Sequence, residues 1–333
     1  MVIIFALLIF GFLIFIHEFG HFFTAKLFGV KVHEFAIGMG PAIFKKNKGE
    51  VLYSVRALPI GGFVKIEGED GDSDDERSFG KIHPLKRVIV LFAGAFMNIV
   101  AGFVIFIVIY SLSSGVLVPV VDSVIENSPA MLAGIKPGDK IVEINGSRVH
   151  IQSDVTFSLY LNGGNEAEIK VLRDGTKLDF RIKPVLEEGR YIIGFYPTVK
   201  NKTFGGILYN AFYNTFFVIR VVFESLKMML MGGATLSDMS GPVGIVGEIG
   251  KAAKDGFLEV LNFAALIAVN LGVMNLLPFP ALDGGRIVFA LIEWLWGKPL
   301  KPEVEGYVHT AGLLILFALM IIITFSDISK LFT

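Results

Sequence analysis

Residues 1–21 read MVIIFALLIFGFLIFIHEFGH, so an uncharged apolar run leads directly into the motif HEFGH at residues 17–21. As a helix, residues 2–16 would rise about 22 Å, which fits inside a hydrocarbon core of about 30 Å. The sequence therefore predicts a transmembrane helix over about residues 2–24. The motif is expected within the membrane, near the end where this helix leaves it.

The HEFGH motif has the pattern H-E-x-x-H. Its spacing places His17 and His21 on one helix face, one turn apart, so both imidazoles can bind one ion. Zinc takes neutral nitrogen ligands and keeps an open position for water, whose proton Glu18 can accept. The alternative is a helix end whose polar side chains snorkel to the interface, but it does not account for the spacing.

The composition is that of a membrane protein, with 53% hydrophobic and only 18% charged residues. A net charge of −1 gives no support to a nucleic-acid partner or an acidic substrate. The absence of cysteine excludes a disulfide framework and a thiolate metal site. The N-terminus lacks the basic start and small-residue cleavage site of a signal peptide, so we expect the first segment in the mature protein.

Three further segments are long and apolar enough to span a membrane, at about 88–112, 258–281 and 307–325. The segment 204–231 is also apolar, but its three charged residues, Arg220, Glu224 and Lys227, share one helix face. We therefore interpret residues 204–257 as an amphipathic, interfacial region. The fold class predicted is an α-helical membrane protein with four transmembrane helices.

The distribution of basic residues predicts the orientation of these helices. Eleven lysines and arginines lie within residues 26–87, and none precedes the first span. The positive-inside rule makes this loop cytoplasmic and the N-terminus external. The second span then places residues 113–257 outside, and the third returns Asp283 to the side of the HEFGH motif. A fifth span at 204–231 would move Asp283 to the opposite side.

Two regions outside the spans have β character. In the cytoplasmic loop, two β-rich runs within about 50–66 flank a turn at Pro59-Ile-Gly61-Gly62, which predicts a membrane-associated β-hairpin or sheet. The external segment 115–197 has alternating strands and turn signals at Gly134, Asn145-Gly146 and Asp174-Gly175. The predicted organisation is thus a membrane core of residues 1–112 and 258–333, interrupted by a β-rich domain and the interfacial region 204–257.

The β-rich segment 115–197 resembles a PDZ domain in the arrangement usual for bacterial proteases. That resemblance implies capture of an extended peptide or a chain end, which adds a strand at a sheet edge. The alternative is a small β domain that binds nothing and only shields the membrane site.

Two histidines leave a third protein ligand to find. The extended soluble motif is excluded, because its remaining positions hold Thr24 and Leu27. Asp283 follows a stretch that two prolines and two glycines break near membrane depth, where irregular backbone is tolerated only if it lines a protein cavity. A carboxylate in such a break is a functional candidate. The alternative is a helix terminus with Asp283 among the lipid headgroups.

Two asparagines of the third span are also candidates. Asn270 and Asn275 are five residues apart and do not share one helix face. A buried asparagine often bridges two helices. Asn275 could instead orient a substrate carbonyl or stabilise an oxyanion.

Three features together resemble the site-2 protease family, in the arrangement of its RseP-type bacterial branch. They are H-E-x-x-H in the first span, a PDZ-like insert after the second, and N-x-x-P-x-x-x-x-D-G at 275–284. A segment at 240–244, Ser-Gly-Pro-Val-Gly, also resembles that branch. One departure is the single PDZ-like unit, where some relatives carry two.

The resemblance implies a role for each candidate residue. His17, His21 and Asp283 would bind zinc, and Glu18 would activate water. Asn275 would hold the substrate, and the hairpin near 50–66 would receive the substrate strand. Asn270, Gly61 and Gly62 are further candidates for substrate binding.

The function implied is that of an intramembrane zinc endopeptidase in the bacterial inner membrane. It would cleave single-span membrane proteins, such as anti-sigma factors or signal-peptide remnants. The bilayer and a peptide ligand of the PDZ-like domain are its other expected partners, with no nucleic acid. A non-catalytic PDZ-bearing adaptor is disfavoured by the intact Glu18. A metal transporter would need repeated halves and several charged intramembrane sites, which the sequence lacks.

Overall fold

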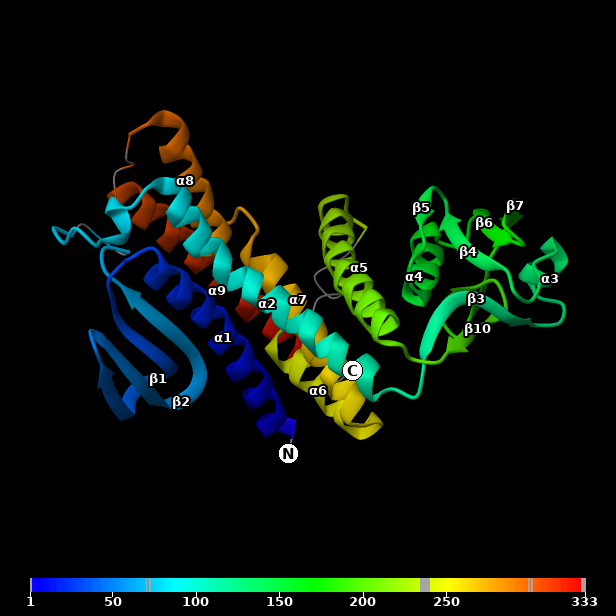
Figure 1. Ribbon diagram of the computed structural model, residues 1–333, viewed down its shortest axis with the longest axis horizontal. Helices are drawn as coiled ribbons and strands as arrows, with labels where there is room; N and C mark the ends of the chain where they lie inside the picture. The colour runs from blue at the N-terminus through cyan, green and yellow to red at the C-terminus, as the bar shows by residue number, and fades with distance from the viewer. Residues whose placement is uncertain are drawn as a thin grey trace. The chain divides into compact units, whose positions relative to one another are not determined.

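The apolar runs of the sequence form long helices. The computed structural model describes residues 2–69, 71, 73–233, 240–298, 300 and 302–330. Within these ranges five helices are long and apolar enough to cross a membrane: α1 (Val2–Leu27), α2 (Pro84–Leu112), α5 (Phe204–Leu230), α7 (Phe257–Asn275) and α9 (Pro302–Lys330) (Figure 1). At about 1.5 Å per residue, even α7 reaches about 28 Å, close to the thickness of the hydrocarbon core.

Helix α5 is the segment interpreted from the sequence as interfacial. It meets the same criteria of length and composition as the other four helices, although its hydropathy is the lowest of the five. Its charged residues Arg220, Glu224 and Lys227 lie in its second half. Helix composition alone therefore gives five candidate spans, one more than the four predicted.

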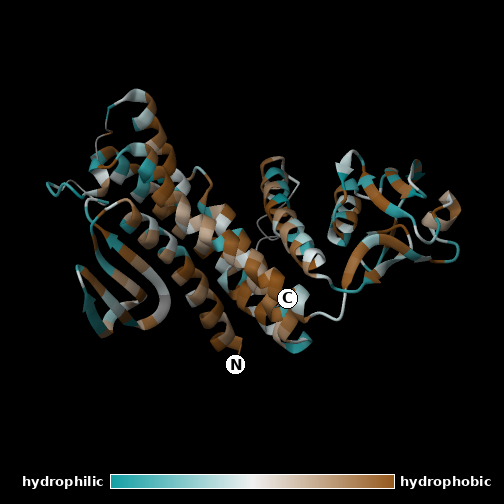
Figure 2. Ribbon diagram, viewed as in Figure 1, coloured by the Kyte–Doolittle hydropathy of each residue, from teal (hydrophilic) through white to brown (hydrophobic). Residues whose placement is uncertain are grey.

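The chain divides into two compact units. The first comprises Met1–Ile105 and Val218–Thr333, and the second comprises Phe106–Phe217. Both α2 and α5 run from one unit into the other. Figure 2 shows α1 and α2 largely brown, whereas the strands of the second unit mix brown with teal.

Small residues allow close packing of the helices in the first unit. A Cβ atom placed on Gly20 of α1 would lie 2.4 Å from the carbonyl oxygen of Ala93 in α2. One placed on Gly272 of α7 would lie 2.7 Å from the carbonyl oxygen of Ala95. Because lipid tails are as apolar as leucine, such van der Waals packing is a principal attraction between membrane helices. Helix α2 is therefore packed between α1 and α7.

A short helix, α6 (Pro242–Asp255), packs on α1, α7 and α9. The buried Asp327 of α9 accepts a hydrogen bond of 2.8 Å from the backbone N–H of Gly244, in the first turn of α6. A Cβ atom on Gly241 would lie 2.9 Å from this carboxylate. The glycines thus let a carboxylate reach a helix N-terminus, where negative charge is stabilising.

The loop after α1 folds as two long, bent strands. β1 (Val32–Lys48) and β2 (Val51–Ile66) pair antiparallel around a tight turn. The register then changes, so that residues 34–37 pair with residues 62–65 and also with residues 52–55. Residues 34–37 therefore lie between two parts of β2, and the two strands build a sheet of four arms.

The predicted hairpin over residues 50–66 is wrong in its pairing. Its two runs do not pair with each other, because residues 34–37 lie between them. The stretch Gly38-Met39-Gly40-Pro41 of β1 also has the composition of a turn. Gly38 and Gly40 do adopt positive φ angles of 86° and 83°, but they bend β1 without ending it.

The second unit is built around one central sheet with the strand order β10-β3-β4-β6-β7, and β5 pairs with β4. A separate two-stranded ladder joins β8 to β9. Ile141 of β4 and the alternate residues Ile169 and Val171 of β6 are fully buried in the apolar core of this unit. The elements are β3 (Val116–Val124), α3 (Pro129–Ala133), β4 (Lys140–Ile144), β5 (Ser147–Arg148), α4 (Gln152–Asn162), β6 (Ala167–Arg173), β7 (Thr176–Ile182), β8 (Val185–Glu187), β9 (Arg190–Ile192) and β10 (Phe195–Lys200).

The turn signals read from this segment are confirmed. Helix α3 ends at Gly134, whose φ of 89° is left-handed. The Asn145-Gly146 turn joins β4 to β5, and the Asp174-Gly175 turn joins β6 to β7. All four of these turn residues have positive φ. This combination is typical of tight hairpins, because it matches the twist of the strands.

Candidate metal centre

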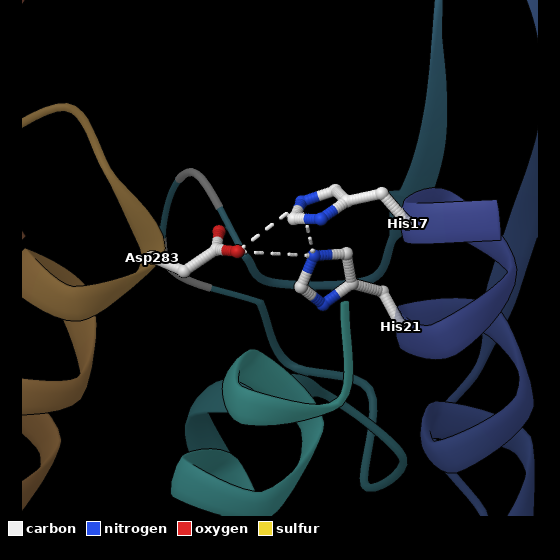
Figure 3. Close-up of side chains that lie close together, drawn as sticks. All are labelled: His17, His21 and Asp283. Carbon is white, nitrogen blue, oxygen red and sulfur yellow. Dashed lines mark hydrogen bonds and ion pairs between the residues drawn. The ribbon is translucent and has the colours of Figure 1, made fainter. Parts of the chain in front are cut away.

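Helix α1 presents two histidines side by side. The Nε2 atoms of His17 and His21 are 3.2 Å apart, and each side chain is 12% exposed. The spacing of four residues brings the rings one above the other on one face, as expected from the sequence. Both nitrogens point toward the start of another helix (Figure 3).

That helix is α8 (Asp283–Trp296), whose first residue is Asp283. Its Oδ2 atom lies 3.2 Å from Nε2 of His17 and 3.5 Å from Nε2 of His21 (Figure 3). Helix α7 ends at Asn275, and the chain turns before α8 begins. The helix break predicted from the prolines and glycines therefore exists, and it places Asp283 beside the histidines.

The turn between α7 and α8 requires glycine at two positions. A Cβ atom on Gly284 would lie 2.1 Å from the carbonyl oxygen of Leu277, and one on Gly285 would lie 2.5 Å from that of Phe279. Ala281 adopts a left-handed φ of 78°, which is unusual for alanine. The tight backbone thus fixes where the first residue of α8 projects.

Two ion pairs fasten α8 to the segment before α2 and to α2 itself. Arg286, one turn after Asp283, pairs with Glu69 at 2.5 Å. The buried Glu293 of α8 pairs with Arg87 of α2. A helix held at both points keeps its first residue in a fixed position, which a metal ligand needs.

The three side chains fit a tetrahedral zinc ion. Two atoms that each lie about 2.05 Å from such an ion are about 3.3 Å apart. The observed separations of 3.2, 3.2 and 3.5 Å match this edge length. Two imidazole nitrogens and one carboxylate oxygen are also ligand types that catalytic zinc sites use, with a fourth position left for water.

Helix α2 supplies contacts to both rings that the sequence did not reveal. The Nδ1 atom of His21 is 2.9 Å from the carbonyl oxygen of Val90, and that of His17 is 3.3 Å from Nδ2 of Asn98. Asn98 is completely buried. The signal that could have found it is its polarity within an otherwise apolar span.

Glu18 faces the sheet. A Cβ atom on Gly62 would lie 3.5 Å from Cγ of Glu18, and the backbone of Val64 forms a hydrogen bond with the Glu18 carboxylate. Both residues belong to the arm 62–66 of β2. The catalytic candidate therefore lies between the two histidines in sequence and against one arm of the sheet in space.

The other candidate residues are less closely tied to the centre. Gly61 adopts a φ of 86°, and a Cβ atom there would meet Met39 at 2.7 Å. Asn275 is the half-buried last residue of α7, whereas Asn270 lies on an exposed part of that helix. The structure thus brings Gly62 to Glu18, and the roles of Gly61, Asn270 and Asn275 stay predictions.

The chain matches the model of peptidase family M50 over residues 5–319. The chain belongs to family M50. A relative from Clostridium acetobutylicum that bears a zinc metalloprotease name is 42% identical over 98% of this chain and 97% of its own. The zinc metalloprotease RasP of Geobacillus kaustophilus is 30% identical over 98% and 97%. The regulator of sigma-W protease RasP of Bacillus subtilis is 31% identical over 98% of each chain.

Membership of family M50 confirms the resemblance to site-2 proteases that was read from the sequence. This M50 protein is an intramembrane zinc metalloprotease, and zinc is its cofactor. Its apolar helices are those of a multi-pass membrane protein. The adaptor and transporter alternatives lose their support.

Proposed function

We propose that His17, His21 and Asp283 hold the catalytic zinc and that Glu18 is the general base. The observation that carries this assignment is the approach of three ligand atoms, from two separate segments of chain, to tetrahedral spacing. Glu18 is adjacent in sequence but turned toward the sheet, which suits a base better than a ligand.

When bound, zinc polarises a peptide carbonyl and lowers the pKa of a coordinated water toward about 7. The Glu18 carboxylate then accepts the proton of the attacking water and delivers it to the leaving amine nitrogen. His17, His21 and Asp283 would hold the ion in place. Asn275 is proposed to hold the substrate carbonyl, and Asn270 to contact the substrate farther along α7.

The arm 62–66 is proposed to present the substrate. It pairs with residues 32–37 on one side, and among the described residues no strand pairs along its other side. A peptide bond within a transmembrane helix is shielded by helical hydrogen bonds, so it must unwind before hydrolysis. An extended substrate can add to this arm as a further strand, and Gly61 and Gly62 leave room beside Glu18.

Four of the five apolar helices are proposed to cross the membrane. The Asp283 carboxylate, at the start of α8 and eight residues after the end of α7, lies beside His17 of α1, so the end of α7 is proposed to lie on the same side of the membrane as the end of α1. If α1 crosses from outside to inside, α2 crosses back. Helix α7 must then cross in the same direction as α1. A single crossing by α5 would reverse the direction of α7. The N-terminus and residues 113–257 are then external, and the basic loop 26–87 is cytoplasmic, in the bacterial inner membrane. Cysteine labelling from outside should modify Ser153→Cys and spare Glu76→Cys, which is at an exposed position of the basic loop; the reverse pattern would invert this topology.

Residues 115–197 are proposed to form a PDZ-like domain that selects substrates. A groove of about 170 Å³ lies between α4 and the β9–β10 region, lined by residues that include Leu159, Tyr191 and Ile193. A groove between a helix and a strand can receive an extended peptide or a chain end, which adds to the sheet edge as a further strand. Titration with a peptide ending in a free carboxylate should shift the NMR signals of these residues. Unchanged NMR signals would argue against peptide binding in this groove.

The proposed substrates are transmembrane segments of single-span proteins. The name of the Bacillus subtilis relative, a regulator of sigma-W, supports a regulatory target of this kind, such as an anti-sigma factor. Remnants of signal peptides are a further proposed class.

The ligand assignment is tested with Asp283→Ala in purified full-length protein. A centre with two histidines alone should lose both zinc, measured by elemental analysis, and cleavage of a single-span substrate. Asp255→Ala, at the end of α6, is the matched control and should keep both. Zinc content equal to that of the unmodified protein in Asp283→Ala would remove Asp283 from the ligand set.

A further inference from the structure

One face of α2 runs directly beneath the two histidine rings. Val90, Gly94 and Asn98 follow one another at intervals of four residues and share this face. A Cβ atom on Gly94 would lie 2.3 Å from Nε2 of His21 and 2.9 Å from Cε1 of His17. The helix therefore touches both rings at Gly94, and the residues one turn to either side reach the Nδ1 atoms.

The contact between His21 and Val90 fixes the tautomer of one ring. A backbone carbonyl can only accept a hydrogen bond, so the Nδ1 atom of His21, 2.9 Å away, carries the proton. The Nε2 atom of the same ring then has a free lone pair on the side of Asp283. Metal-binding histidines are oriented by this kind of contact.

His17 needs the same arrangement. Its Nε2 atom faces Asp283 at 3.2 Å, so Nδ1 must carry the proton if Nε2 is to bind a metal. The group opposite Nδ1 is the side-chain amide of Asn98 at 3.3 Å. Only the amide oxygen can accept a proton from Nδ1, and this oxygen is buried without another hydrogen-bond partner.

The two ends of an amide side chain have nearly the same shape. A half-turn about the last bond of Asn98 exchanges its nitrogen and oxygen and brings the oxygen to Nδ1. The exchange gives Oδ1 the partner that it otherwise lacks. A metal-bound His17 thus selects one of the two amide orientations.

We propose that Asn98 is a positioning residue of the metal centre, whose amide oxygen accepts a hydrogen bond from the Nδ1–H group of His17 and thereby aims Nε2 at the metal. The proposal rests on the ligand assignment made above. Asn98 does for His17 what the carbonyl of Val90 does for His21. The competing role is that of a polar residue that only joins α1 to α2.

Replacement by an acceptor and by an apolar residue distinguishes these roles. An ionised aspartate can accept from Nδ1 but cannot donate, and leucine can do neither although its size is similar. The zinc dissociation constant of each full-length variant is measured in detergent by competition with a chromogenic chelator. Loss of such an orienting contact weakens metal binding by about 10- to 100-fold.

Asn98→Leu should show this loss, whereas Asn98→Asp should bind zinc about as tightly as the unmodified protein. Asn210→Ala is the matched control, since Asn210 is also a buried helical asparagine but donates to Gly206 of its own helix. Its zinc affinity should not change. If Asn98→Leu does not fold, Asn98→Ala removes the amide without adding bulk and takes its place.

Equal losses in the aspartate and apolar variants would overturn the proposal, because the amide would then be a donor or a packing element. Unchanged affinity in all of them would overturn it as well. His17→Ala separates this failure from that of the ligand assignment. If His17→Ala keeps its zinc, the assignment of His17 itself is wrong, whatever the Asn98 variants do.

Discussion

The two units of this M50 protein are assembled in opposite ways. The second unit is one continuous segment, Phe106–Phe217, whose strands pair mostly with near neighbours around an apolar core. The first unit joins two distant segments, and the proposed metal centre draws two of its residues from one segment and the third from the other. In this unit, apolar side chains alone do not distinguish one helix contact from another, and close packing at glycines and a few polar contacts join the helices.

The two units should therefore be sensitive to different substitutions. In the second unit, stability depends on apolar burial, so core substitutions should unfold it. In the first, a few polar atoms and the glycines beside them decide the chemistry, so their replacement should stop catalysis while the helices remain. The following variants test whether the two properties separate in this way.

Glu18→Gln should have the largest effect. Removing a general base lowers the rate by about 10²- to 10⁴-fold, while the proposed zinc ligands stay intact. The values to compare are kcat/KM on a single-span substrate, zinc content and melting temperature. Substantial turnover by this variant would refute the mechanism, and loss of zinc would show that Glu18 also supports the metal.

Gly62→Ala should have a moderate effect on activity alone. Its Cβ atom would lie 2.9 Å from the carbonyl oxygen of Ala36 and 3.5 Å from Cγ of Glu18. Overpacking of this kind costs about 1–3 kcal/mol and is relieved by a shift of the arm beside Glu18. A rise of the activation barrier by the same amount would lower kcat/KM by about 5- to 150-fold, with zinc retained. Gly247→Ala is the control, because nothing lies within 4 Å of a Cβ atom there. Equal activities for the two variants would argue against a substrate strand along this arm.

Ile169→Ala should affect stability of the second unit without touching the metal centre. The side chain is fully buried in β6, and its truncation costs about 2–5 kcal/mol. Hydrogen exchange should show faster opening of residues 116–200, with unchanged zinc affinity. Leu132→Ala, at an 81% exposed side chain, should change little. Zinc loss in Ile169→Ala would mean that the two units are not independent.

Acid should weaken the second unit by the smallest amount. Burial raises the pKa of Asp139, but hydrogen bonds from Arg173 and from the Lys136 backbone outweigh it and hold this pKa below its ordinary 3.8. The stabilisation is thus present above the ordinary value and is lost as the pH falls through the lowered one. Hydrogen bonds to a charged group contribute about 1.5–3 kcal/mol. In Asp139→Asn, the stability deficit seen at pH 7 should shrink on acidification, and a constant deficit would contradict the assignment.

The same contrast explains what the sequence could predict. Turns such as Asp174-Gly175 and the cap at Gly134 depend on neighbouring residues, so the β-rich segment was readable. The histidines share one helical turn, and Asp283 was marked by the broken backbone before it.

Features that depend on distant partners were not readable. The sheet around residues 34–37 needs both parts of β2, and a local turn pattern favours a simple hairpin. Asn98 is one polar residue in a long apolar helix, and its spacing alone does not show that it faces His17. The role of Gly62 beside Glu18 follows only from the folded strand.

The proposed ligand set is divided between two distant segments, and this division has a consequence for biosynthesis. Asp283 follows His21 by 262 residues, so a nascent chain inserts the HEFGH motif long before the third ligand exists. A partly made chain therefore has no complete centre and cannot cut the membrane proteins around it. Once α8 is in place, the three residues could hold an ion between them, and the free energy of metal binding would then also stabilise the assembled helices. On this proposal, the enzyme becomes active only when Asp283 has been synthesised and has reached the two histidines.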